Sequence, residues 1–251
     1  MRASAIIDAS TSRVFMMCGC TTQGRLHAFD KFGTIQWQLA LPGSRDMSAA
    51  ALQFGAHFRL YVPTNNGDLY AVDDMGSVGV VAWHVHVGAH INGSPSIGPD
   101  GTIFVPLLGG VSAVKDNGLS AQVLAGWPVA ITGDVDTTPA ISNGKLFTSS
   151  YQSGTRTVSA IDIARHTALW SLTGTGTQQA SFALTPSPVV GANGWVYAAN
   201  GPDVYAFDPA SATPYTPKWH FTVGDNAIAL TVGDGVIYVG AQDAKLYALV
   251  S

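Results

Sequence analysis

The stretch AFDKFGTIQW, residues 28–37, decides the fold because its pattern returns along the chain. A small residue and an acid are followed by a glycine and then by a tryptophan. The repeated alanines are spaced 43, 42, 47, 46 and 42 residues apart, at Ala28, Ala71, Ala113, Ala160, Ala206 and Ala248. Five copies carry the tryptophan, as Trp37, Trp83, Trp127, Trp170 and Trp219. The sixth copy, ALVS at 248–251, has none.

Each repeat also contains a short hairpin signal. The dipeptides are Asp100-Gly101, Asn143-Gly144, Asn193-Gly194 and Asp234-Gly235. Such pairs accept the positive φ angles of a two-residue type I′ turn between antiparallel strands. No segment shows a 3.6-residue apolar period, so we expect few helices. Four short strands recurring every 42 to 47 residues are typical of a β-propeller.

We therefore expect an all-β fold, a six-bladed β-propeller of four-stranded antiparallel blades, in a single domain over residues 1–251. The blades are expected to begin near residues 3, 47, 91, 135, 183 and 226. The last blade offers only three strands, in 226–233, 235–242 and 245–251, so its third strand should present an open edge. Three interpretations remain open: a partner supplies the missing strand, the chain belongs to a longer propeller, or blade six packs directly on blade one.

Charge and hydropathy narrow the classes of partner. The formal net charge is −4 and no run is rich in Lys or Arg, so we expect no nucleic acid partner. No apolar run approaches the roughly 20 residues that span a bilayer, so we expect no membrane span. Asp8 interrupts the apolar start of the chain, and we therefore expect no signal peptide in residues 1–251.

The repeat resembles that of the quinoprotein (PQQ-type) propellers, whose motif runs A-x-D-x-x-(T)-G-x-x-x-W. AFDKFGTIQW matches with one residue deleted, and AIDIARHTALW at 160–170 keeps the spacing with His166-Thr167 where the family prefers Thr-Gly. The resemblance implies that each tryptophan lies on an outermost strand and packs between neighbouring blades. It assigns structural docking to Trp37, Trp83, Trp127, Trp170 and Trp219.

The same resemblance raises the question of a quinone cofactor. The classical enzymes of the family use PQQ with calcium, eight blades and a disulfide between adjacent cysteines. Here Gly19 separates Cys18 from Cys20, and no acidic cluster is assignable to calcium. We expect free thiols, no cofactor and a non-catalytic scaffold or interaction module, similar to the propeller scaffold proteins of the bacterial envelope. A periplasmic or secreted location follows from that resemblance.

Two other functions stay open. One is a ligand-sensing propeller domain, and the other is a fragment of a PQQ-dependent dehydrogenase, which would require PQQ with calcium. For the preferred scaffold, the open edge of blade six predicts a protein partner or self-association.

Two groups of residues are the weak candidates for a metal or ligand. His84 and His86 share one face of a strand, with His90 shortly after, a spacing that paired imidazole ligands use. Asp134 and Asp136 lie where blade four is expected to begin and lead into an inner strand, where carboxylates can hold a cation or a polar ligand. In both groups a solvated strand or loop is the simpler interpretation. We therefore assign no catalytic residue and no metal site.

Overall fold

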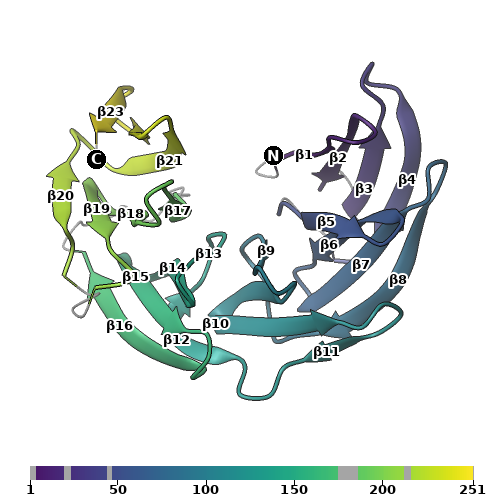
Figure 1. The fold of residues 1–251 in the computed structure, drawn as a ribbon, viewed down its shortest axis with the longest axis horizontal. Helices are drawn as coiled ribbons and strands as arrows, with labels where there is room; N and C mark the ends of the chain where they lie inside the picture. The colour runs from purple at the N-terminus through teal and green to yellow at the C-terminus, as the bar shows by residue number, and fades with distance from the viewer. Residues whose placement is uncertain (1–3, 20–23, 44–46, 175–185, 212–215, 251) are drawn as a thin grey trace. The chain divides into compact units, whose positions relative to one another are not determined.

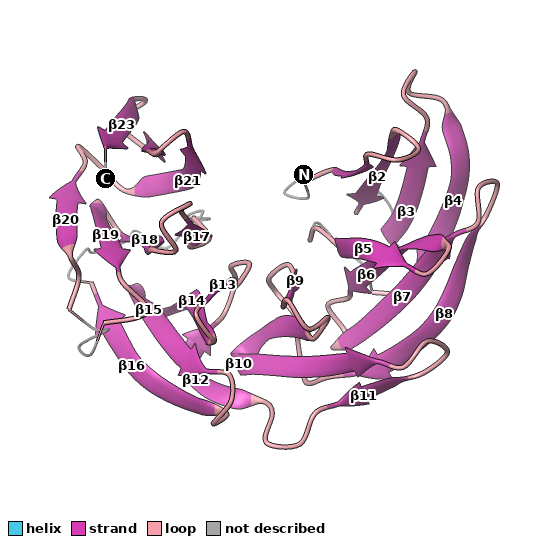
Figure 2. Ribbon diagram, viewed as in Figure 1, coloured by secondary structure: helices cyan, strands magenta, loops and turns pink. Residues whose placement is uncertain are grey.

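The computed structural model describes residues 4–19, 24–43, 47–174, 186–211 and 216–250 (Figure 1). Every regular element among these residues is a β-strand, and none is a helix (Figure 2). Within the same residues there is accordingly no apolar helix of a length that crosses a membrane. The chain forms two compact units, Met1–Pro128 and Val129–Ser251, and each is described by itself. The expected all-β class is confirmed.

The N-terminal unit contains three antiparallel sheets. Two are four-stranded and ordered as in the sequence, β1-β2-β3-β4 and β5-β6-β7-β8. In the third, β9 pairs with the first residues of β10, and β11 pairs with its last residues. The strands are β1 (Ile6–Asp8), β2 (Arg13–Cys18), β3 (Gly24–Phe29), β4 (Ile35–Leu41), β5 (Ala50–Phe54), β6 (His57–Pro63), β7 (Asp68–Asp74), β8 (Gly79–His86), β9 (Ser96–Ile97), β10 (Ile103–Asp116) and β11 (Ala121–Val123).

The C-terminal unit repeats the same arrangement. The strands β13-β14-β15-β16 pair in sequence order, with β12 also pairing to β14, and β17-β18-β19-β20 form the next sheet. The last sheet has three strands among the described residues, β21-β22-β23. The strands are β12 (Val129–Asp134), β13 (Ala140–Ser142), β14 (Lys145–Gln152), β15 (Thr155–Asp162), β16 (Thr167–Thr173), β17 (Val189–Val190), β18 (Val196–Asn200), β19 (Asp203–Phe207), β20 (Trp219–Thr222), β21 (Ala227–Gly233), β22 (Val236–Ala241) and β23 (Leu246–Val250).

Two of the four expected type I′ turns were wrong. At Asn143-Gly144 both residues have positive φ, 47° and 68°, as a type I′ turn requires, and Asp234-Gly235 is similar. At Asp100-Gly101 and Asn193-Gly194 only the glycine has positive φ. There the side-chain oxygen of Asp100 accepts the N–H of Thr102 instead, which holds Asp100 in an ordinary conformation and moves the reversal to the glycine.

The expectation of a free thiol at Cys18 was also wrong. Cys18 is disulfide-bonded. The expectation assumed one continuous strand through both cysteines, whereas β2 ends at Cys18. Cys20 lies outside the described residues.

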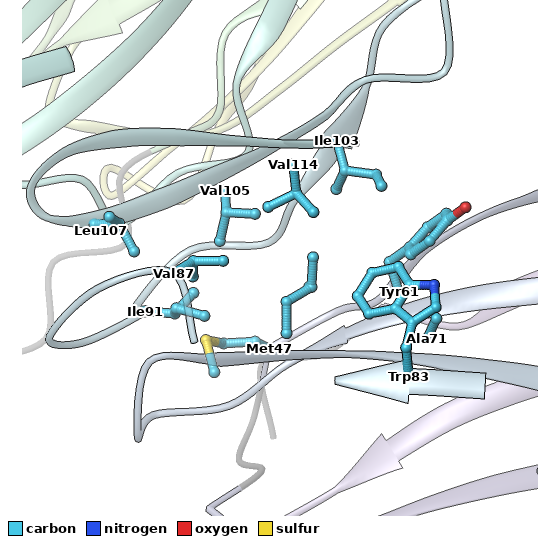
Figure 3. Packing of buried hydrophobic residues seen from close by; sticks show 11 residues of the cluster. Met47, Tyr61, Ala71, Trp83, Val87, Ile91, Ile103, Val105, Leu107 and Val114 are labelled. Atoms are coloured by element: carbon cyan, nitrogen blue, oxygen red, sulfur yellow. The ribbon is translucent and has the colours of Figure 1, made fainter. Parts of the chain in front are cut away.

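The hydrophobic core lies between neighbouring sheets of each unit. In the N-terminal unit, one buried cluster joins β1–β4 to β5–β8 and a second joins β5–β8 to β9–β11. Figure 3 shows part of the second cluster, with Tyr61 and Trp83 side by side and Ile103 and Val114 facing them. Two similar clusters join the successive sheets of the C-terminal unit. Each sheet is thus stabilised mainly by the face of its neighbour.

A fixed side-chain register accompanies this packing. The repeated alanine of the third strand lies opposite the tryptophan of the fourth strand in four sheets, as Ala28–Trp37, Ala71–Trp83, Ala160–Trp170 and Ala206–Trp219. On the other side, the same alanines lie opposite an aromatic residue of the second strand, Phe15, Tyr61, Phe147 and Tyr197. Alanine is small enough to leave the space that the two rings share, at centroid separations of 5.8 to 6.0 Å.

This register predicts the result of enlarging the alanine. Ala71 is 0% exposed, so Ala71→Leu should force the Tyr61 and Trp83 rings apart and lower the free energy of unfolding by about 1 to 3 kcal/mol, the usual cost of overpacking. Ala248 holds the equivalent position in β23 but is exposed, so Ala248→Leu should change stability little. Urea denaturation of both variants measures the difference, and equal effects would contradict the role given to the alanine.

Candidate functional site

The most developed polar site is a buried group of charges in the N-terminal unit. Arg59 of β6 donates to both oxygens of Asp73, at 2.6 and 2.7 Å, and its Nη1 donates to Asp116 at 2.9 Å and to the carbonyl oxygen of Gly118 at 2.7 Å. Its side chain is 3% exposed and lies over the ring of Phe54. A guanidinium so buried requires this number of acceptors, because an unpaired buried charge is strongly unfavourable.

Asp116 receives donors from two aromatic residues as well. The indole Nε1 of Trp83 donates to its Oδ1 at 3.0 Å, and the Tyr61 hydroxyl donates to its Oδ2 at 2.8 Å. Hydrogen bonding to Asp73, opposed by burial, raises the pKa of Arg59. Burial and then the hydrogen bond to Asp116 raise the pKa of the Tyr61 hydroxyl. The group therefore stays ionised at Arg59 and protonated at Tyr61 over the physiological range.

A second copy of this arrangement joins the first two sheets. Trp37 donates its Nε1 to Asp74 Oδ1 at 2.8 Å, and Arg13 Nη1 donates to the same carboxylate at 2.7 and 2.8 Å. We call each trio of arginine, tryptophan and aspartate a clamp: Arg13, Trp37 and Asp74 form the first clamp, and Arg59, Trp83 and Asp116 form the second. In each clamp, one sheet supplies the cation and the tryptophan, and the next sheet supplies the carboxylate.

The clamps follow a sequence rule that the A-x-D pattern does not contain. The accepting carboxylate lies three residues after the repeated alanine, as in Ala71 with Asp74, whereas the pattern places its acid two residues after. At that earlier position the acids act within their own sheet: Asp30 accepts the N–H groups of Phe32 and Thr34, both at 2.9 Å, and Asp73 accepts from Arg59. An aspartate three residues after the repeated alanine is therefore the sequence signal that would have predicted the clamp.

The C-terminal unit contains an incomplete clamp. Lys145 holds the repeat position of Arg13 and Arg59, two residues before the ring opposite the alanine, and its Nζ donates to the backbone oxygen of Pro209. Pro209 lies three residues after Ala206, where the other clamps have an aspartate. The indole Nε1 of Trp170 is buried and has no hydrogen-bond partner among the described residues. The tryptophan and the cation are thus present, and the carboxylate is replaced by proline.

The other tryptophans lie in similar surroundings. Trp127 is 8% exposed and its ring lies 5.4 Å from that of Phe104. Trp219 is half-buried with its ring 5.8 Å from that of Tyr197. Trp219 lies on the fourth strand of its sheet, as expected, and contacts the second strand. The expectation of an outermost strand was wrong for Trp127, which lies in the loop after β11 and contacts Phe104 of β10.

The three candidate histidines have different neighbours. His86 contacts Asp68 across the sheet at 2.9 Å, and His84 stacks on Tyr70 with centroids 5.2 Å apart. His90 lies 3.4 Å from the amide of Asn65 in a separate loop. In the part of the chain that the structure describes, no three His, Cys, Asp or Glu side chains gather in a group that could hold a metal ion.

One of the two candidate carboxylates lies beside a buried cation. Asp134 ends β12 and is paired in register with Tyr151, and Asp136 lies 3.5 Å from Nη1 of Arg156. The Arg156 side chain is 6% exposed and its guanidinium lies over the Tyr151 ring, 5.0 Å from the centroid. Burial lowers the pKa of Arg156, and Asp136 opposes that effect. Asp136 and Arg156 thus form a pair of opposite charges.

Asp73 and Asp116, the two carboxylates that face Arg59, do not fit the calcium that accompanies PQQ. Calcium takes six to eight oxygen ligands. The carboxylates that share one site, Asp73 and Asp116, both face the Arg59 guanidinium, which fills the position between them. These residues provide a structural ion pair in place of a cation site.

One small cavity opens in the C-terminal unit. It has a volume of about 190 Å³ and is lined by Gly191, Ala192, Asn193, Tyr197, Val232, Gly235 and Ile237. Asn193 donates to the Tyr197 hydroxyl at 3.1 Å at this position. The volume is below the roughly 300 Å³ at which cofactor pockets begin.

The second clamp predicts a large effect of a single charge. Asp116→Asn removes the charge that faces Arg59, and breaking a buried pair in this way should cost about 3 kcal/mol or more in the free energy of unfolding. Asp208→Asn is the matched control, because Asp208 pairs with Lys218 near the surface and should contribute less than about 1 kcal/mol. Chemical denaturation measures both, and a loss at Asp116 no larger than that at Asp208 would refute the clamp.

The incomplete clamp predicts that a carboxylate at position 209 increases the stability of the fold. Pro209→Asp places a carboxylate where Trp170 and Lys145 can both donate, whereas Pro209→Ala places none. The Asp variant should be more stable than the Ala variant by about 1 kcal/mol, the typical net value of a hydrogen bond. Slower exchange of the Trp170 indole proton in ¹⁵N-labelled protein is the second readout, and unchanged exchange would contradict the assignment.

Comparisons with known proteins concern the fold alone. No family model matches the sequence, and no curated protein matches it. Among solved structures, the chain is similar to BamB from Moraxella catarrhalis, with a TM-score of 0.55 and 15% identity over 98% of this chain and 84% of the other. It is similar to the hydrazine synthase of Kuenenia stuttgartiensis, with a TM-score of 0.69 and 13% identity over 96% and 74%. It is also similar to Raptor of Chaetomium thermophilum, with a TM-score of 0.71 and 10% identity over 99% of this chain and 24% of that one. These likenesses show a propeller-like, all-β fold of antiparallel sheets.

Proposed function

We propose that the chain is a non-catalytic scaffold, a six-bladed propeller of the quinoprotein-repeat type that binds another protein. The proposal groups the strands into six blades: β1–β4, β5–β8, β9–β11, β12–β16, β17–β20 and β21–β23. Its support is the recurring alanine–tryptophan register, together with the propeller-like fold and the similarity to BamB. A periplasmic or secreted location is part of the same proposal.

The use of the acidic residues supports a structural role. Asp74 and Asp116 each accept a tryptophan and an arginine from the preceding sheet, and Asp73 completes the pairing of Arg59. Asp74 and Asp116 thus hold neighbouring sheets together. These repeated contacts therefore make the packing of the sheets rigid, as a binding scaffold requires.

The observation that carries the proposal is a set of exposed apolar side chains on the N-terminal unit. They lie at or beside the turns between the third and fourth strands of three successive sheets, and we call them the turn surface: Phe32, Met75, Val78 and Leu119. Phe32 is 82% exposed and Leu119 is 85% exposed. Because the same turn recurs in sheets that pack face to face, these tips emerge along the same side of the unit. In this proposal the four side chains together provide the apolar surface to which another protein binds.

A second candidate function rests on the cavity beside Asn193 and Tyr197. It joins apolar walls to an amide and a hydroxyl, the composition of a small-ligand pocket, so a sensor of a small metabolite is the alternative. A ligand of that kind would raise the melting temperature in proportion to its concentration, because it binds only the native state.

Site-specific crosslinking tests the scaffold. A photoreactive amino acid at position 32 or 119, in cells of the source organism, should form adducts with one protein, and the same amino acid at the exposed Gln53 should not. That protein, once purified, should bind the wild-type chain saturably and bind Phe32→Ser at least about ten-fold more weakly, since a large apolar side chain contributes more than 1.4 kcal/mol when buried.

Two results would reject this function. One is stoichiometric binding of PQQ with calcium accompanied by dye reduction, which would favour the dehydrogenase fragment. The other is equal crosslinking at positions 32, 119 and 53, which would mean that the turn surface has no preferred partner.

A further inference from the structure

The last sheet contains the aromatic ring and the alanine of the repeated register, but no tryptophan among the described residues. In the four sheets with the complete pattern, an aromatic ring of the second strand, an alanine of the third and a tryptophan of the fourth lie in one row. In the last sheet, Tyr238 of β22 lies opposite Ala248 of β23, as Tyr61 lies opposite Ala71. No strand pairs with the other side of β23 in the described part of the chain.

Exposure shows that one face of the last sheet is uncovered, the face that in the complete sheets packs against both the tryptophan of the fourth strand and the next sheet. The rings opposite the alanine in the complete sheets, Phe15, Tyr61, Phe147 and Tyr197, are at most 1% exposed, whereas Tyr238 is 36% exposed. Leu246 is 73% exposed, while its equivalents Leu26, Leu69, Val158 and Val204 are all 0% exposed. The residues of β23 thus have the composition of a buried third strand and the exposure of a surface strand.

The edge of β23 also lacks the features that protect natural edges. Its sequence from Leu246 to Val250 has no charge and no proline, and β22 and β23 pair without a bulge. In two other sheets the carbonyl of the repeated alanine accepts an N–H from the following segment: Ala206 from Lys218 and Ala113 from Leu124, both at 2.8 Å. By repeat equivalence, the carbonyl of Ala248 faces the open edge and can accept in the same way.

We propose that the edge of β23 is a docking site for an extended strand that carries a tryptophan, pairs antiparallel and places its tryptophan opposite Ala248. The incoming ring packs on Tyr238 at the separation of 5.8 to 6.0 Å found in the complete sheets. Backbone hydrogen bonds provide affinity, and the tryptophan provides the specificity, as in other cases of strand addition. The inference rests on the proposed propeller scaffold and names one partner chemistry for it.

The experiment uses the whole chain and a peptide of its own β4 sequence. The peptide TIQWQLAL, residues 34–41, carries lysines at its ends for solubility and a fluorophore for anisotropy. It should bind saturably and slow hydrogen exchange at residues 246–250. The same peptide with Trp37→Ala should bind at least about ten-fold more weakly, because it retains the backbone hydrogen bonds and loses the ring contact.

Two protein variants locate the site. Ala248→Lys should reduce peptide binding at least about ten-fold, because a charged side chain then occupies the position opposite the tryptophan. Ala210→Lys, a change at an exposed turn residue, should bind normally. If Ala248→Lys does not fold, Tyr238→Ser tests the same contact, because it removes the ring on which the incoming tryptophan packs, and it should also weaken binding.

Three outcomes would overturn the inference. They are equal binding of the Trp37→Ala peptide, protection of the edge-facing amides of Leu246, Ala248 and Val250 in the free chain at low concentration, and self-association through β23 that the peptide does not displace. These outcomes leave crosslinking at the turn surface unaffected. Loss of that crosslinking with intact peptide binding would instead reject the scaffold proposal and leave the strand site standing.

Discussion

The contact between a tryptophan ring and the small space above an alanine is the constraint on which the rest of the structure depends. A sheet of three or four short strands cannot enclose a core of its own, so each sheet must bury one face against its neighbour. Tryptophan supplies the largest apolar area for that purpose, and its indole N–H then needs an acceptor in a buried place. At Trp37 and Trp83 the acceptor is a carboxylate of the next sheet, and an arginine balances its charge.

This coupling explains why the clamps occur as trios. A lone carboxylate such as Asp116 would be unfavourable in so buried a place, and so would a lone guanidinium at Arg59. Together they satisfy one another and fix the distance between two sheets. Where Pro209 replaces the carboxylate, Lys145 turns to a backbone oxygen and Trp170 keeps a buried donor without a described partner. The repeat therefore tolerates the loss of the carboxylate from a clamp, because the sheets still pack through their apolar side chains.

The sequence was sufficient for the all-β class, for the strand order of the sheets β1–β4, β5–β8 and β17–β20, and for the three strands of the last sheet among the described residues, because these follow from periodic residues. The four strands expected for the third blade were wrong, because β10 runs without a break from Ile103 to Asp116 and pairs with both β9 and β11. The first strands of the sheets begin one to six residues after the expected blade starts. The type I′ turns at 100–101 and 193–194 were wrong because a side-chain oxygen competes with the turn backbone, a contact that dipeptide patterns do not contain. The clamps were not predicted, for two reasons. Their members come from two different sheets, and the accepting aspartate stands one residue after the acid of the A-x-D pattern. The neighbours of Asp136 and His86 likewise depend on cross-strand contacts, with Arg156 and with Asp68.

The interaction between Trp83 and Asp116 permits the most direct test of this account. A double-mutant cycle with Trp83→Phe and Asp116→Asn, followed by urea denaturation, isolates the pairwise term from the loss of packing. The account predicts a coupling free energy of about 1.5 kcal/mol or more, as expected for a buried hydrogen bond to a charged group. Additive effects, with a coupling free energy below about 0.3 kcal/mol, would contradict the claim that the carboxylate of one sheet holds the tryptophan of another.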